Sequence, residues 1–213
     1  MVDNFEKIRS LLRFDNPGDD FYYIQVIKRR KENPSMGKNS RDIRSYYVSS
    51  LEHYDSLIPE LKELAELFNA RVYINVNPRS FKNIANYVAR EVSNYLLNES
   101  YRSIPNVYNS CCGRYGKVGN KRKYYIVDID FNCSDEFIRE VMNDLNNKYL
   151  PKDTNKVKLI NKTVNGYHIL VSQFDVNSFM RDYSHMNIGS DKKKIDVLKN
   201  QNTLLYYKKI NKY

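Results

Sequence analysis

Two carboxylates separated by one apolar residue form the most chemically informative feature of the sequence. Asp128 and Asp130 stand in the run Tyr125-Ile126-Val127-Asp128-Ile129-Asp130-Phe131. Side chains on a strand alternate between its faces, so we expect both carboxylates on one side and the apolar residues in a core. Neighbouring carboxylates repel each other unless a cation joins them, and such oxygen ligands favour Mg²⁺ or Mn²⁺. The pair therefore predicts a divalent-metal site that serves phosphate chemistry.

A histidine and a third acidic residue follow in later apolar runs. His168 lies in Asn165-Gly166-Tyr167-His168-Ile169-Leu170-Val171, and Asp196 lies in Lys194-Ile195-Asp196-Val197-Leu198. If these runs are strands of one sheet with the first pair, the carboxylates and the imidazole meet on one face. That face would bind one or two metal ions and a triphosphate, with His168 hydrogen-bonded to a phosphate. The predicted catalytic residues are Asp128, Asp130, His168 and Asp196, and the three carboxylates are the predicted metal ligands.

Each candidate also has a purely structural interpretation. An acidic pair in a strand is often a solvated edge, and a lone histidine is often hydrogen-bonded within its sheet. Asp196 follows two lysines, Lys193 and Lys194, with which it could pair. The strongly apolar neighbours of the acidic pair and the later Gly-x-His favour the functional interpretation.

Composition limits the class of protein. The chain has 213 residues, 41% of them hydrophobic, and a formal net charge of +10, which favours an anionic partner such as nucleic acid. An AT-rich genome would account for part of this basic excess. Three cysteines form no disulfide framework, and the adjacent pair Cys111-Cys112 lacks the gap typical of zinc sites. No apolar run could span a bilayer and no leader is recognisable, so we expect no membrane partner and a cytoplasmic protein, in the host cytoplasm if phage-encoded.

Hydrophobic periodicity predicts an α+β fold. Pro59 is predicted to open a helix, and Ser80 and Ser134 to cap two others. The predicted helices are 4–14, 59–68, 81–96, 134–147 and 176–183, and the predicted strands are 21–27, 43–48, 71–76, 124–131, 157–162, 166–172, 194–198 and 203–207, the last two as a pair.

The order of these elements predicts two lobes fused as one compact unit. Residues 98–120 are polar and irregular, which places the boundary between an N-terminal αβ lobe, 1–110, and a C-terminal lobe, 111–213. The second lobe has the order βαββαβ, which predicts an RRM-like, mostly antiparallel sheet with helices on one face and an open face for function. Asn165-Gly166 is predicted to form its hairpin turn through positive φ angles.

Basic residues near the acidic strand are predicted to contact the phosphates of a nucleotide or nucleic acid. Arg114 and Lys117 belong to a glycine-rich segment that leads into that strand, and its glycines would let the backbone approach phosphate. Lys158 and Lys162 alternate on the strand before the histidine. Arg79 stands at a helix start, where free amides favour an anion. The alternative is an ordinary set of solvated cations.

The acidic and histidine motifs together give the chain a family resemblance. An acidic pair among apolar residues is followed by a small residue, any residue and His, and then by a final Asp on a strand. The matching positions are Asp128-Ile129-Asp130, Gly166-Tyr167-His168 and Asp196. In these motifs, their order and their separations, the chain resembles the archaeo-eukaryotic primase superfamily, the primase–polymerases. The resemblance covers roughly residues 124–207 and, more loosely, the lobe before them.

The resemblance implies roles for these positions. Asp128, Asp130 and Asp196 would hold Mg²⁺ or Mn²⁺, and His168 would contact the phosphates of the incoming nucleotide. The second motif of the family usually begins with Ser. Gly166 stands there in this chain, which removes a hydroxyl contact to the nucleotide.

We therefore predict an enzyme, a metal-dependent nucleotidyltransferase of primase–polymerase type. It would make or extend a nucleic-acid strand from nucleoside or deoxynucleoside triphosphates on a single-stranded DNA or RNA template. No zinc-binding or helicase segment accompanies the motifs, so a replicative helicase would be a separate chain. The small size suits a bacteriophage or mobile element. A metal-dependent nuclease and a non-catalytic module that binds single strands are the alternatives.

Overall fold

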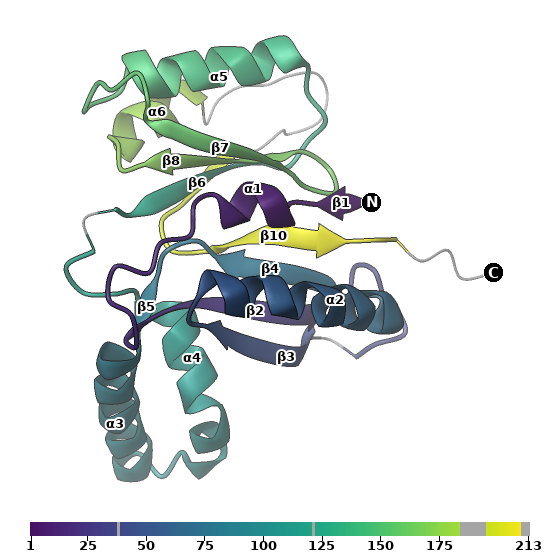
Figure 1. Ribbon diagram of the computed structural model, residues 1–213, viewed down its shortest axis with the longest axis vertical. Helices are drawn as coiled ribbons and strands as arrows, with labels where there is room; N and C mark the ends of the chain where they lie inside the picture. Colours follow the sequence, from purple (N-terminus) through teal and green to yellow (C-terminus); the bar gives the residue numbers. More distant parts are fainter. Residues whose placement is uncertain (38, 121, 184–194, 210–213) are drawn as a thin grey trace.

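The computed structural model describes residues 1–37, 39–120, 122–183 and 195–209, and it confirms a mixed α+β fold (Figure 1). The strands of this described part form two antiparallel sheets. The first has the order β1-β10-β4-β2-β3, with β5 paired to β2, and the second has the order β7-β8-β6-β9. The strands are β1 Val2–Asp3, β2 Asp20–Lys28, β3 Arg41–Val48, β4 Arg71–Asn75, β5 Arg79–Ser80, β6 Tyr124–Ile129, β7 Val157–Lys162, β8 Tyr167–Ser172, β9 Ile195–Leu198 and β10 Asn202–Tyr207.

Six α-helices and one 3-10 helix complete the described part of the chain. No helix among these residues is long and apolar enough to cross a membrane. The helices are α1 Phe5–Arg9, α2 Leu51–Phe68, α3 Phe81–Leu97, η1 Tyr101–Asn106, α4 Val107–Arg114, α5 Asp135–Asn147 and α6 Val176–Tyr183.

Helix α2 covers the first sheet and starts earlier than predicted. Its buried residues Tyr54, Leu61 and Ala65 pack in the same core as the apolar side chains of β2 and β4. The prediction that Pro59 opens the helix is wrong, because Ser50 caps it instead and accepts a hydrogen bond from the His53 backbone N at 3.0 Å. Proline lacks one backbone donor, but the packing of both flanking turns keeps the helix continuous across it.

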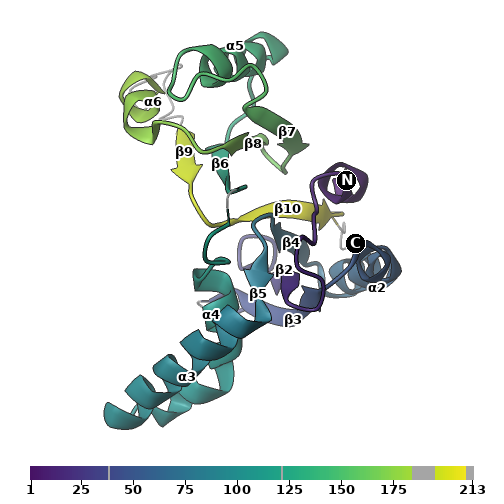
Figure 2. The ribbon, with the colours of Figure 1, turned by 60° about the vertical axis from the view of Figure 1, so that its left-hand side comes forward.

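Helices α5 and α6 cover the outer face of the second sheet. On this face of β6, Val127 and Ile129 are fully buried in a core with apolar residues of α5 such as Val141, and Tyr125 is partly buried beside them. Ser134 caps α5 as predicted, accepting from the Phe137 backbone N at 3.2 Å. Both views place these helices on the side of the second sheet that faces away from the first sheet (Figures 1 and 2). The residues of β6 between these core positions therefore face the first sheet.

The sequence predicted that the inner face of the second sheet would be open. Part of this face instead packs on the first sheet. Ile126 and Leu170 from this face are buried in the core that also contains Val72 and Ile74 of β4. Apolar residues at these positions need a partner, and the first sheet supplies it. Asn4 adds a polar link, since its side-chain Nδ2 donates to the carbonyl oxygens of Lys162 at 3.0 Å and Leu204 at 2.9 Å.

The last described strand returns to the first sheet, so the two sheets do not divide at residue 110. β9 pairs with β6, whereas β10 pairs with β4 and β1. The predicted pairing of 194–198 with 203–207 is therefore wrong, and Lys194 lies outside the described residues. β10 instead pairs along the edge of β4, where its residues Leu204 and Tyr206 are buried. The first sheet is thus built from both ends of the chain.

The segment predicted to be irregular is largely helical. Residues 101–114 form η1 and α4, which pack against α3, and the three helices extend away from the sheets (Figure 2). Polar and small residues hid this helix from the periodicity analysis, yet Cys111 and Cys112 are fully buried beneath α3. Burial raises the pKa of the Cys112 thiol to about 12.

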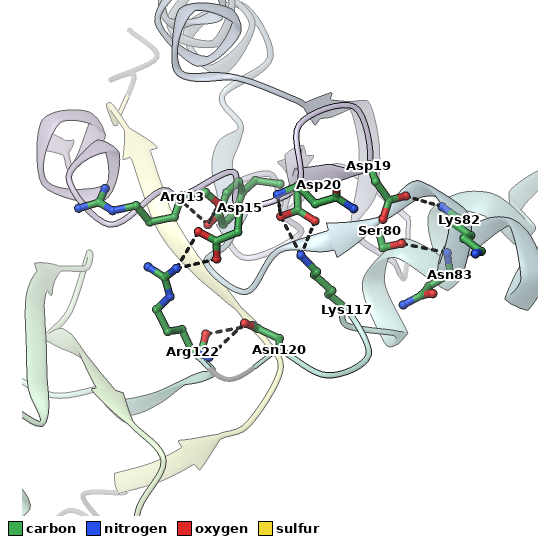
Figure 3. Close-up of polar contacts among 12 residues, drawn as sticks. Arg13, Asp15, Asp19, Asp20, Ser80, Lys82, Asn83, Lys117, Asn120 and Arg122 are labelled. Atoms are coloured by element: carbon green, nitrogen blue, oxygen red, sulfur yellow. Dashed lines mark hydrogen bonds and ion pairs between the residues drawn. The ribbon is translucent and has the colours of Figure 1, made fainter.

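An ion pair fastens the segment that joins α4 to β6. The Nζ of Lys117 lies 2.6 and 2.8 Å from the two carboxylate oxygens of Asp20 (Figure 3). Asp20 itself is only 1% exposed. The predicted phosphate contact of Lys117 is therefore corrected to a structural contact, because the buried carboxylate already engages this ammonium group.

Replacing Lys117 with Met will lower the free energy of unfolding by about 3 kcal/mol, because it leaves the Asp20 carboxylate buried without a counter-charge. Adding Asp20→Asn to this variant removes the unpaired charge and should restore most of the loss. Chemical denaturation of both variants measures the effect. A double variant no more stable than Lys117→Met would contradict this account of the pair.

Candidate functional site

A cavity of about 500 Å³ lies where the ends of the two sheets meet, and it contains three of the four predicted catalytic residues. Asp128 and Asp130 line it from β6 and the residue just after that strand, and His168 lines it from β8. Residues 163–165 of the β7–β8 hairpin and Leu198 of β9 complete this side. The alternation of side chains along β6 thus gathers the polar groups as the sequence predicted.

Asp128, His168 and Asp196 occupy one row across the second sheet. Asp128 is the register partner of His168 on one side and of Asp196 on the other. The Nε2 of His168 lies 3.2 Å from Oδ1 of Asp128, whose side chain is 28% exposed. In antiparallel strands, directly opposed residues share a face, so all three side chains project from the inner face. Asp196 is not among the described residues that line the cavity.

A hydroxyl from the first sheet fixes the orientation of the His168 ring. The Nδ1 of His168 lies 2.9 Å from Oγ1 of Thr203 on β10, and Asn161 donates to the same oxygen at 3.2 Å. With a proton on Nε2, the nitrogen that faces the carboxylate, this N–H donates to Asp128, while Nδ1 and the threonine hydroxyl share the second hydrogen bond. The first sheet thereby aims the imidazole N–H at Asp128.

We expect Thr203→Val to lower the free energy of unfolding by about 1–3 kcal/mol, because it leaves Asn161 and His168 buried without their shared partner. Valine has nearly the volume of threonine, so packing is preserved. Thermal unfolding measures the loss, with Thr154→Val at an exposed turn position as the control. Equal stability of the two variants would show that the hydroxyl does not hold the ring.

Cations from the first sheet form another part of the cavity lining. Arg29 and Lys31 follow β2, and Arg71 lies on β4 beside Tyr73. The Tyr73 hydroxyl oxygen accepts hydrogen bonds from Arg29 at 3.1 Å and from Arg71 at 3.4 Å. Burial of Arg29 lowers its pKa, whereas Tyr73 and the nearby acids Glu32 and Asp130 raise it. The net result is a raised pKa. The cavity thus combines carboxylates of one sheet with guanidinium groups of the other.

Arg71 is the most firmly held of these cations. It is 7% exposed and forms an ion pair with Glu32, whose side chain is 9% exposed. Its guanidinium also lies over the Tyr207 ring, 5.2 Å from the centroid. The Nε atom of Arg71 is buried and has no hydrogen-bond partner among the described residues. Its guanidinium is therefore held in place by Glu32 and by the Tyr207 ring.

Gly166 brings the β7–β8 hairpin against the end of β6. A Cβ atom at this position would lie 1.9 Å from the carbonyl oxygen of Ile129 and 2.8 Å from that of Phe131. Neither Asn165 nor Gly166 has a positive φ, so the predicted reason for glycine in this turn is wrong. Close backbone contact requires it instead. For the same reason, a serine could not occupy this position as it does in the family that the motif resembles.

Three predicted cations lie in hollows apart from the cavity. Arg114 and Lys117 line one hollow and Lys158 lines another. Lys162 is exposed at the end of β7 and is not among the described residues that line the cavity. These side chains are therefore not brought to Asp128 and His168.

Arg79 does not hold a phosphate at the start of α3, because its side chain is fully buried. Its Nε donates to the Cys112 carbonyl oxygen at 2.7 Å and its Nη1 to that of Asn77 at 2.8 Å. Burial lowers its pKa to about 10. The guanidinium instead fastens α4 to the turn after β4, a structural role that the sequence did not reveal.

Among the described residues, no group of three or more His, Cys, Asp and Glu side chains is arranged to hold a metal ion. No protein-family model, curated protein or solved structure matches the chain. The site is therefore interpreted from its own geometry.

Sequence reasoning missed the cations of the first sheet and the hydroxyl of Thr203. The basic run 28–31 after β2 was visible, and Arg71 and Tyr73 alternate on β4. Their proximity to Asp128 depends on how the two sheets pack, which no local pattern records. Thr203 was equally hidden, because its strand was assigned to the other sheet.

Proposed function

We propose that the cavity binds a nucleoside triphosphate with a divalent metal ion, and that the chain is a nucleotidyltransferase of primase–polymerase type. The observation that carries the proposal is the pairing of opposite charges in one cavity. Asp128 and Asp130 come from the second sheet, and Arg29, Lys31 and Arg71 come from the first. Its volume of about 500 Å³ falls in the usual range of small-ligand pockets.

Asp128 and Asp130 fit a Mg²⁺ or Mn²⁺ site. Mg²⁺ is commonly held by one or two carboxylates while substrate phosphates and water fill its other positions, so two cavity-lining carboxylates suffice without a third. Asp196, the register partner of Asp128, would be an additional metal ligand in this proposal. A bound ion would neutralise phosphate charge and activate the attacking hydroxyl.

The cations and the histidine would hold the triphosphate. Guanidinium groups bind phosphate oxygens through paired hydrogen bonds, and Arg29, which lines the cavity, would supply such donors. When Asp128 binds a metal ion, the N–H of His168 would be released from this carboxylate and could contact a phosphate. In the transfer, the hydroxyl oxygen of the growing strand bonds to the α-phosphorus, its proton passes to solvent and pyrophosphate leaves.

The arrangement of the second sheet supports a C-terminal RRM-like lobe. The chain order β6-α5-β7-β8-α6-β9, with the spatial order β7-β8-β6-β9, is that of the split βαβ fold. In RNA-recognition folds, a four-stranded sheet of this type presents its uncovered face to nucleic acid. Here the proposed reactive groups lie on the face opposite α5 and α6, which is consistent with the primase–polymerase resemblance.

A labelled single-stranded template tests the proposal. We expect the purified chain with Mn²⁺ to incorporate labelled nucleotides into products longer than any added primer, and only when nucleoside triphosphates are present. Shortened strands without nucleotides would indicate the nuclease instead. Retention of the template with neither product would indicate a binding module.

A further inference from the structure

Three adjoining hollows are lined by residues of the segments 115–120 and 122–124, near the start of β6 and away from Asp128. The two larger have volumes of about 490 and 430 Å³, and a small hollow shares lining residues with each of them. They share lining residues, since Lys123 lines both large hollows and Arg13 and Arg122 line the small one and one large one. We call these adjoining hollows the linker groove. Its basic lining residues are Arg13, Arg114, Lys117, Arg122, Lys123 and Lys158.

The charge of the linker groove is strongly one-sided. Its lining contains six basic residues and a single acidic one, Asp15. Arg122 uses its Nη2 to bind both carboxylate oxygens of Asp15, at 2.7 and 2.6 Å (Figure 3). Arg13 extends toward the same side as Arg122 in this view. None of the ion pairs among the described residues includes Arg13, Lys123 or Lys158. Lys117, Arg122 and Arg114 lie against Asp20, Asp15 and Glu91, so the uncompensated positive charge of the groove comes from Arg13, Lys123 and Lys158.

Aromatic rings line the same groove. Tyr124 lines the small hollow and one large hollow, and Tyr115 lines the other large one. The Tyr115 ring is stacked on Tyr87, with centroids 3.9 Å apart, and Arg90 lies over both rings. Cations and rigid aromatic rings on one surface are the combination that binds single strands without reading their sequence.

The position of the groove links it to the proposed active site. Tyr124 begins β6 and Asp128 lies four residues later, about 13 Å along the strand. Ile126 and Leu170 are buried between the two sheets, between Tyr124 and Asp128. A nucleic-acid strand running from the groove to the cavity would therefore pass around this packed interface. The turn between β9 and β10 provides this route, since Leu198 and Gln201 line the cavity and Asn200 lines the groove.

We propose that the linker groove binds the sugar–phosphate backbone of a single-stranded nucleic acid, which reaches the cavity across the β9–β10 turn. This inference rests on the proposed function for the destination of the strand. The binding itself stands on the groove alone. Backbone phosphates would contact Arg13, Lys123 and Lys158, and bases would stack on Tyr115 or Tyr124.

The triple variant Arg13→Gln/Lys123→Gln/Lys158→Gln tests the groove. We expect it to bind a labelled oligothymidylate at least about tenfold more weakly than the unaltered chain. The slope of log K against log salt concentration should become shallower by about 2, because each single-strand phosphate contact contributes about 0.7. Fluorescence anisotropy at several salt concentrations measures both quantities, and an unchanged thermal midpoint shows that the variant is folded.

The matched control, Arg139→Gln/Lys152→Gln/Arg181→Gln, removes the same charge from exposed positions at the far end of the second lobe. It should keep both the affinity and the salt slope. Equal weakening of the control would show that bulk charge alone binds the strand, and an unaffected triple variant would show that the strand binds elsewhere. Either result overturns the proposal.

Nucleotide binding separates this inference from the proposed function. The triple variant should still bind a fluorescent nucleoside triphosphate with Mn²⁺, because the cavity is untouched. If the chain incorporates nucleotides but the triple variant holds the strand normally, the groove proposal fails alone. If the triple variant loses the strand while the unaltered chain yields no product with any combination of nucleotides and metal, the proposed function fails alone.

Discussion

Replacing Asp128 and Asp130 together with asparagine is expected to reduce nucleotide incorporation at least about a thousandfold. Loss of the metal ligands removes several kcal/mol of charge stabilisation at the reacting phosphate, and each 1.4 kcal/mol corresponds to about tenfold in rate. Asparagine keeps the shape of each side chain, and its oxygen can still accept from His168. Primer-extension rates with Mn²⁺ and labelled nucleotides measure the effect.

Binding of the single strand by the same variant should stay equal or become tighter, because two negative charges are removed. The control Asp135→Asn/Glu140→Gln removes the same charge from exposed positions of α5, behind the other face of the sheet. It should retain full activity. Incorporation by Asp128→Asn/Asp130→Asn within tenfold of the unaltered chain would show that these carboxylates do not hold the catalytic metal.

Gly166→Ala is expected to be among the most destabilising single substitutions in the chain, costing more than about 4 kcal/mol. The added Cβ would lie 1.9 Å from the Ile129 carbonyl oxygen, and a backbone atom cannot rotate away as a side chain can. For a chain of this size, the thermal midpoint should fall by about 10 °C or more. Gly166→Ser should behave in the same way.

Gly113→Ala provides the comparison. This glycine lies in α4 with nothing within 4 Å of a built Cβ, and alanine in a helix is favoured over glycine by up to about 1 kcal/mol. The control should therefore be neutral or stabilising in thermal unfolding. The close contact would be refuted by a Gly166→Ala midpoint that matches that of Gly113→Ala. Because the contact flanks Asp130, any folded fraction of Gly166→Ala should also lose nucleotide incorporation.

The sequence allowed the strands of the candidate site to be predicted, because their signal is local. The alternation around Asp128 and the Gly-x-His motif both correspond to observed strands, β6 and β8. The same alternation gave the correct face for the acidic pair. The direct opposition of Asp128 and His168 required knowledge of strand register, which depends on pairing between distant segments.

The features that were missed all depend on contacts between distant parts of the chain. Arg71 reaches the cavity only because β10 joins β4 and brings the second sheet over the first. Helix α4 escaped notice because its buried positions are one valine, Val107, and two adjacent cysteines in an otherwise polar segment. Gly166 was correctly expected in a turn, but its true constraint is the backbone of another strand, which the turn sequence alone does not reveal.

A crystal soaked with Mn²⁺ and a non-hydrolysable nucleoside triphosphate tests the central claim most directly. The anomalous signal of manganese locates the ion independently of any assumption about the site. We predict Mn²⁺ about 2.1 Å from carboxylate oxygens of Asp128 and Asp130, with the triphosphate oxygens against Arg29 and Arg71. A metal ion and nucleotide bound away from these carboxylates would contradict the proposed active site.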